Sequence, residues 1–151
     1  MIVKPGDFTD PQVVALLQAH LLGVRGILPP ENVYALDASE LQAPDISFYA
    51  AWDRDILLGI GALKQLSAGA GEIKSMRTDP DHLRKGVGWR LLDHLVSIAH
   101  TRGYQRVSLE TGFGAAFEPA LALYRRYGFT NGEVFGDYKP SPFNQFLHLS
   151  L

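Results

Sequence analysis

The stretch from Met76 to Arg90 contains residue types that could bind a phosphate group. A strand-like run is followed by a turn at Pro80, by the cations Arg84 and Lys85, and by two glycines that open an amphipathic segment. Glycine lets backbone N–H groups approach a ligand closely, and the start of a helix carries roughly half a positive charge. The pattern therefore predicts a cradle for a pyrophosphate, although the spacing alone fits a plain strand-to-helix turn with solvated cations equally well.

Other phosphate-binding and catalytic patterns are absent. The chain has no G-x-x-x-x-G-K-[ST] loop, and Leu91 stands where a dinucleotide-binding fingerprint requires its third glycine. No serine lies in a Gly-x-Ser-x-Gly elbow, and the five histidines lack metalloprotease spacing. With zero cysteines the chain can form no disulfide, thiolate metal site or acyl-cysteine. We therefore expect no metal and no covalent enzyme intermediate on cysteine.

Length and composition describe an ordinary globular chain. It has 151 residues, of which 46% are hydrophobic and 20% charged, and we expect a single domain over residues 1–151. The formal net charge of -2 leaves no basic excess to attract nucleic acid or a membrane surface. We find no apolar signal core at the start and no run near 18 apolar residues, so we expect a cytoplasmic protein.

Hydrophobic periodicity indicates which elements position the glycine-rich turn. Alternating residues predict strands at 46–53, 56–63 and 72–78, and their short connections favour an antiparallel meander. Helical spacing begins at Gly86 and ends near Gly103. The glycine-rich turn therefore lies between the third strand of the meander and a helix.

The second half of the chain continues with a strand at 106–111 and a helix at 119–128. A strand, a helix and a strand in this order predict a right-handed crossover between parallel strands. The fold class is therefore α+β. The remaining expected elements are a short strand at 2–4, a helix from residue 9 or 10 to about 23, a short helix within 29–41, and two strands after residue 129.

These residues resemble a known family, the GCN5-related N-acetyltransferases (GNAT). Its signature [Q/R]-x-x-G-x-[G/A] matches residues 83–88, with Leu83 in place of the usual Gln or Arg. A second signature, A-x-x-L-Y-x-x-x-G-F, matches residues 120–129. Within the family, the wording of residues 72–78, 108–112 and 135–138 is similar to a small bacterial YsnE-type branch.

The resemblance implies a mixed, mostly antiparallel sheet of about six to seven strands, with helices on both faces and a splay between strands 4 and 5. Acetyl-CoA would lie in that splay as co-substrate, with its pantetheine arm beside the third meander strand and its pyrophosphate on the glycine turn. The implied cofactor-binding residues are Met76, Arg77, Thr78, Arg84, Lys85, Gly86, Val87, Gly88, Trp89 and Phe117.

The implied reaction is direct N-acetyl transfer to a primary amine of a small molecule or peptide. An ammonium with a pKa of about 10.4 must first lose a proton, and a leaving thiolate gains from a proton donor. Tyr124 matches the family's acid, although the residues alone fit a packed helix tyrosine. Glu72 and Glu110 remain alternative bases. The alternative function is a non-catalytic acyl-CoA-binding regulatory module, and pairing of edge strands into a homodimer stays open.

Overall fold

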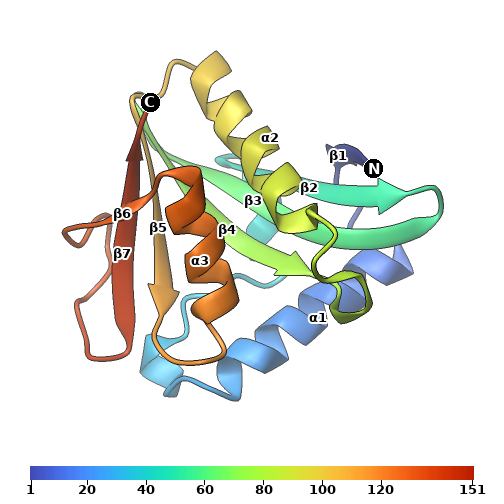
Figure 1. The fold of residues 1–151 in the computed structure, drawn as a ribbon, viewed down its shortest axis with the longest axis horizontal. Coiled ribbons are helices and arrows are strands. Elements are labelled where there is room, and N and C mark those ends of the chain that lie inside the picture. Colours follow the sequence, from blue (N-terminus) through green and yellow to red (C-terminus); the bar gives the residue numbers. More distant parts are fainter.

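The computed structural model describes residues 1–151, which form one seven-stranded sheet and three α-helices (Figure 1). No helix in the chain combines the length and the apolar character that crossing a bilayer requires. The α-helices are α1 (Pro11–Arg25), α2 (Val87–Thr101) and α3 (Glu118–Tyr127). The strands are β1 (Ile2–Pro5), β2 (Ile46–Asp53), β3 (Ile56–Ser67), β4 (Ala70–Thr78), β5 (Arg106–Gly112), β6 (Thr130–Asn131) and β7 (Asn144–Ser150).

The sheet is antiparallel except at one pair of strands. Its order is β1-β2-β3-β4-β5-β7-β6, and β4 runs parallel to β5. Parallel neighbours need a crossover connection, and here the chain leaves β4, passes through α2 and returns as β5. The mixed α+β fold predicted from the sequence is therefore confirmed, and the start of α2 follows closely after the end of β4.

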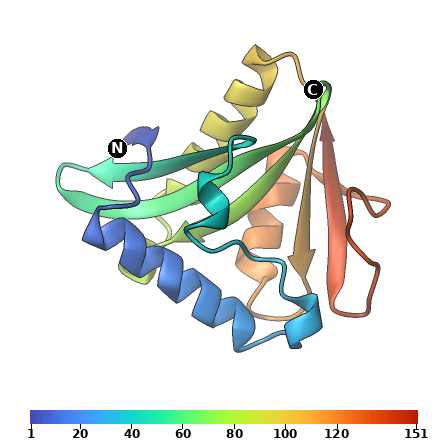
Figure 2. The ribbon, with the colours of Figure 1, turned by 180° about the vertical axis from the view of Figure 1, so that it is seen from behind.

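Helices cover both faces of the sheet. In Figure 1, α2 and α3 lie in front of the sheet, and Figure 2 shows α1 on the opposite face. On the sheet side of α2, the α2 residues Leu92 and Leu95 are fully buried in a core that also includes residues of α3. The α1 residues Val13 and Leu17 are buried in a second core. Burial of each such side chain stabilises the fold by about 1.5–3 kcal/mol, so both helical layers are firmly attached.

β4 and β5 pair only at their beginnings. Residues 70–72 stand opposite residues 106–108, after which the two strands separate (Figure 1). On its other side β4 carries a bulge against β3, where the paired positions shift from Ala62–Lys74 to Ile60–Arg77. Ser75 lies in this bulge with a φ of +56°, an unusual backbone conformation for a residue with a side chain. The expected splay between the fourth and fifth strands is therefore present.

The first helix continues beyond its expected end at Gly23. It reaches Arg25, and Gly26 closes it by donating its backbone N–H to the Leu22 carbonyl (3.0 Å). Gly23 lies within the last turns of the helix, so its role is different from that of a helix stop.

The short helix expected within residues 29–41 is present only as short 3-10 turns. The segment holds two 3-10 turns, η1 (Pro30–Asn32) and η2, the second spanning Glu40–Gln42. Asp37 and Glu40 exchange side-chain-to-backbone hydrogen bonds of 2.8 and 3.2 Å, which close η2 as a local turn. The segment has no regular apolar stripe, so nothing extends these turns into a helix.

Candidate functional site

A cleft of about 410 Å³ opens where β4 and β5 separate. Its walls come from β4, β5, α3, the second half of α1, and the segments that carry Tyr34 and Tyr138. The splay therefore brings together side chains that are far apart in the sequence. The ionisable side chains of the wall are His20, Tyr34, Glu72, Lys74, Arg77, Glu110, Tyr124 and Tyr138.

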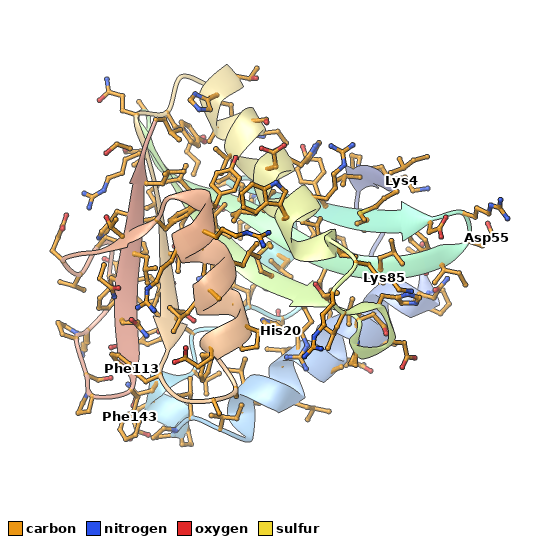
Figure 3. All side chains as sticks on the ribbon, viewed as in Figure 1. Lys4, His20, Asp55, Lys85, Phe113 and Phe143 are labelled. Carbon is orange, nitrogen blue, oxygen red and sulfur yellow. The ribbon has the colours of Figure 1, made fainter.

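The glycine turn leaves the start of α2 open. Gly86 precedes the helix as its N-cap with a φ of +80°, so only Gly88 of the two glycines lies inside the first turn, which corrects the expectation that the helix starts at Gly86. No side chain caps this end, and the first N–H groups of α2 remain free for an anion. Arg84 and Lys85 are exposed beside it, and Figure 3 shows Lys85 at this end of the helix.

The other residues of the first turn have separate roles. A Cβ atom on Gly88 would lie 2.9 Å from Leu123 Cδ2, so this glycine lets α2 approach α3. The side chain of Val87 is buried in the core, and only its backbone can meet a ligand. The Trp89 ring is partly exposed and lies 4.8 Å below the guanidinium carbon of Arg126.

The predicted residues at the end of β4 point in different directions. The Met76 sulfur packs close to Gly61, where an added Cβ would lie only 2.7 Å away. The Arg77 side chain turns to the opposite face and reaches α1, whereas Thr78 lies on the side of α2. Phe117, which precedes the first residue of α3, packs against Gly112 at the end of β5 and lines the cleft. Met76, Arg77 and Phe117 are therefore in the wall, and Thr78 adjoins the glycine turn.

Tyr124 projects from α3 into the cleft wall. Its side chain is buried, and burial raises the pKa of the Tyr124 phenol well above its usual value. The hydroxyl is protonated at neutral pH like that of any tyrosine, and its raised pKa means that it gives up its proton only to a strongly basic group in the cleft. Tyr127, about one turn later, lies outside the cleft and instead donates to Asp93 (2.8 Å).

Glu72 is already engaged by two neighbours. This carboxylate is buried, and it accepts hydrogen bonds from the Tyr138 hydroxyl and from Lys74 Nζ (3.3 Å). Lys74 also donates to the Tyr138 oxygen (2.7 Å), which closes a three-membered network. Burial and the negative charge of Glu72 raise the pKa of Tyr138, so this phenol stays neutral. The network compensates the charges of Glu72 and Lys74.

Glu110 is the carboxyl group of the cleft that titrates near neutral pH. It is half-buried on β5, and burial raises the pKa of Glu110 to about 7 although the nearby positive charge of Lys74 opposes the shift. Such a group exists in both protonation states at neutral pH, as a general base requires.

Three functional side chains were not selected from the sequence. Lys74 lies two residues after Glu72 on β4, and alternate residues of a strand share a face, so the sequence pattern does indicate that the two side chains are neighbours. No spacing in the sequence points to Tyr138, because its contact with Glu72 spans 66 positions. His20 was considered only as a metal ligand. It lines the cleft, and burial followed by the charge of Arg77 lowers the pKa of His20 to about 4.

No group of three or more His, Asp or Glu side chains is arranged to hold a metal ion. The chemistry that the described side chains offer is proton transfer and anion binding, with a donor on α3 and an acceptor on β5 facing the same cleft.

Comparisons with known proteins agree with this geometry. Residues 13–129 match the sequence model of the Acetyltransferase (GNAT) family. The chain is 48% identical over 151 residues to the uncharacterized N-acetyltransferase YsnE of Bacillus subtilis (strain 168), covering 100% of both chains. It is 43% identical over 149 residues to the uncharacterized N-acetyltransferase YedL of Escherichia coli (strain K12), covering 99% of this chain and 94% of the other.

The fold also resembles that of solved structures. The crystal structure of a proposed acyl-CoA N-acyltransferase from Klebsiella pneumoniae subsp. pneumoniae superposes with a TM-score of 0.77 at 26% sequence identity. The superposition covers 99% of this chain and 97% of that chain, so it includes the splayed strands and the helices on both faces.

The burial of Glu110 leads to a direct prediction. In ¹³C NMR spectra of side-chain carboxyls, we expect one glutamate to titrate with a midpoint near pH 7, and the signal to be absent in Glu110→Gln. Lys74→Met removes a positive charge that favours the carboxylate, so the midpoint should rise further. A midpoint below pH 5 in the unaltered protein would contradict the burial described here.

Proposed function

Because the chain belongs to the acetyltransferase (GNAT) family, we propose that it transfers the acetyl group of acetyl-CoA directly to a primary amine. The observation that carries this proposal is the uncapped start of α2 beside a cleft whose wall holds the protonated Tyr124 and the titratable Glu110. Direct transfer is favoured because the chain has no cysteine to carry the acetyl group.

The residues present fit acetyl-CoA as the donor. When bound, acetyl-CoA supplies a reactive acetyl thioester at the end of a long arm with a negatively charged diphosphate. The free N–H groups at the start of α2 would hold the diphosphate, with Arg84 and Lys85 adding positive charge. The edge of β4 beyond residue 72 has no strand partner and would pair with the arm near Met76 and Thr78. Two relatives in sequence are described as N-acetyltransferases, and one protein of similar structure is described as an acyl-CoA N-acyltransferase, which supports this choice of donor.

We assign the role of general acid to Tyr124. A thiolate with an intrinsic pKa of about 8.5 leaves more easily when a nearby group donates a proton. The Tyr124 hydroxyl is protonated, faces the cleft and belongs to the matched family signature. The proton would move from the Tyr124 oxygen to the leaving sulfur, and the proton that the attacking nitrogen loses on becoming an amide would return through water to the phenolate.

We assign the role of general base to Glu110 rather than to Glu72. An acceptor ammonium must lose a proton before its nitrogen can attack, and a carboxylate with a pKa of about 7 accepts that proton better than an ordinary carboxylate does. Glu72 already binds Lys74 and Tyr138, so its part is to hold Tyr138 over the cleft. The base must be ionised, and activity should therefore increase as the pH rises through about 7.

In this function residues 1–151 act as one catalytic domain, because α1, the central strands and the segment before β7 all contribute to the cleft.

The absence of cysteine fits a reducing compartment, and we expect the reaction to take place in the cytoplasm.

The glycine turn can be tested by placing a carboxylate in it. Gly86→Glu should reduce CoA affinity by at least about 100-fold in titration calorimetry, because the new charge would meet the diphosphate at close range. Gly103→Glu is the matched control, since Gly103 has a φ of +79° against +80° for Gly86 and both positions are open. Equal CoA affinity in the two variants would refute the cradle.

Removal of the Tyr124 hydroxyl should slow the chemical step. In Tyr124→Phe we expect kcat to fall by about 100-fold with little change in KM, as is usual for loss of a general acid. Tyr127→Phe removes a hydroxyl from the same helix outside the cleft and should retain most of the activity. Similar losses in both variants would assign the effect to the helix and not to proton donation.

The choice of base can be tested by pH profiles. In the unaltered enzyme, kcat/KM should rise through about pH 7, and Glu110→Gln should lose this rise. Glu72→Gln should keep the rise but shift it to lower pH, because the negative charge of Glu72 contributes to raising the pKa of Glu110. The opposite pattern in the two variants would transfer the role of base to Glu72.

A further inference from the structure

Arg77 is the cation of the cleft wall that has no partner. The other cation, Lys74, is bound by Glu72 and Tyr138. The guanidinium of Arg77 forms no ion pair and no side-chain hydrogen bond, although this residue is partly buried and lines the cleft. A guanidinium has five N–H donors, and the nitrogens of Arg77 are not among the buried polar atoms, so they are open to the cleft and to an anion within it. This arrangement favours an anion that arrives with the substrate.

The guanidinium rests on the backbone of α1. A Cβ atom on Gly23 would lie 3.2 Å from Arg77 Nη2 and 3.3 Å from Nη1, so the glycine makes room for the charged group. A glycine within a helix costs about 1 kcal/mol relative to alanine, and this close approach accounts for its presence. Arg77 is thereby held on the α1 face of β4, whereas the start of α2 adjoins the opposite face at Thr78. The open helix end and Arg77 therefore form two separate anion sites.

His20 adds a second polar group to the same corner. It lies about one turn before Gly23 on α1, and Figure 3 shows it on the side of the helix that faces the sheet. Its Nδ1 atom is buried and has no hydrogen-bond partner. The ring is neutral, because burial and the charge of Arg77 both disfavour its protonation. The other ring nitrogen, Nε2, is not among the buried atoms, and a neutral imidazole protonated there can donate one hydrogen bond to an anion that Arg77 attracts.

From this placement we propose that Arg77 and His20 form a carboxylate-binding subsite, and that the acceptor is a small amine that carries a carboxylate, such as an amino acid. This inference rests on the proposed function and specifies its substrate class. The charge of Glu72 is matched by Lys74 and Glu110 serves the reacting amine, so the positive charge of Arg77 is the one left over. A polyamine would instead bring additional positive charge next to Arg77.

The size of the cleft agrees with a small acceptor. About 410 Å³ must hold both the reacting end of the donor and the acceptor, and pockets for one small ligand have about 300–1,000 Å³. Tyr34 and Tyr138 close the acceptor side with their rings 4.8 Å apart. The carboxylate would meet Arg77 on the α1 face while the amine points toward Glu110 on β5.

The test compares amines that differ only in the carboxylate. The panel is the set of protein amino acids and their decarboxylated counterparts, for example L-lysine with cadaverine and L-phenylalanine with phenethylamine. For the best amino acid we expect kcat/KM to exceed that of its counterpart by about 10- to 100-fold, the usual range for one charge-assisted interaction. An equal or higher value for the decarboxylated amine would overturn the subsite.

Two test variants, Arg77→Gln and Gly23→Ala, and one control variant, Arg54→Gln, show whether the preference depends on Arg77. In Arg77→Gln the ratio of the two kcat/KM values should fall to near one, whereas Arg54→Gln, which removes an exposed arginine of the β2–β3 turn, should keep the original ratio. Gly23→Ala should lower the ratio without loss of thermal stability, because the added methyl group displaces the guanidinium while alanine favours the helix. An unchanged ratio in Arg77→Gln, or a loss of CoA affinity in its place, would refute the assignment.

A binding measurement separates this inference from the proposed function. If no amine is acetylated, the proposed function fails, but the Arg77 Nε–Hε signal in ¹⁵N NMR still reports on the subsite. With CoA present, N-acetylglycine should shift this signal and N-acetylglycinamide should not, because only the first has a carboxylate. Equal responses to the two compounds would overturn the subsite independently of any activity.

Discussion

The separation of β4 from β5 is the constraint on which the rest of the structure depends. After three paired positions the parallel ladder stops, and the facing edge of β4 is left with N–H and C=O groups that need water or a ligand. Ser75 in the adjoining bulge adds a strained backbone, which costs about 1–3 kcal/mol. The core beneath α2 and α3 includes Ile73 of β4 and Leu109 of β5, so packing fixes both strands where they separate. The protein thus keeps open a slot that a ligand backbone can fill.

The electrostatics of the slot follow from which charges find partners in it. Glu72 and Lys74 compensate each other and bind Tyr138, which ties the segment before β7 to β4 across the cleft. Burial makes the charged form of Glu110 costly, and the charge of Lys74 and a hydrogen bond with Asn144 offset this cost only in part. The same low exposure keeps Tyr124 protonated. Burial thus favours the protonated form of both groups, and at neutral pH only Glu110 also exists in its charged form.

The sequence predicts local features better than contacts between distant segments. The glycine turn, the crossover helix and the three central strands depend on neighbouring residues, and all of them are present. The fit of Gly88 against Leu123 depends on how two helices pack, which no spacing shows. The hydrogen bond from Tyr138 to Glu72 likewise depends on the path of an irregular segment. Within residues 29–41 the Pro-Pro pair indicates the start of a helix, but only a 3-10 turn forms there because no apolar stripe extends it.

Gly23 illustrates why a residue type can be interpreted wrongly without its surroundings. In the sequence it resembles a helix stop, since glycine often follows the last helical turn. In the structure it is inside α1, where its missing side chain lets Arg77 of β4 lie against the helix. The first helix therefore lines the cleft from one face of the sheet, while α3 lines it from the other. The slot between β4 and β5 thus lets side chains from both faces of the sheet line one cavity.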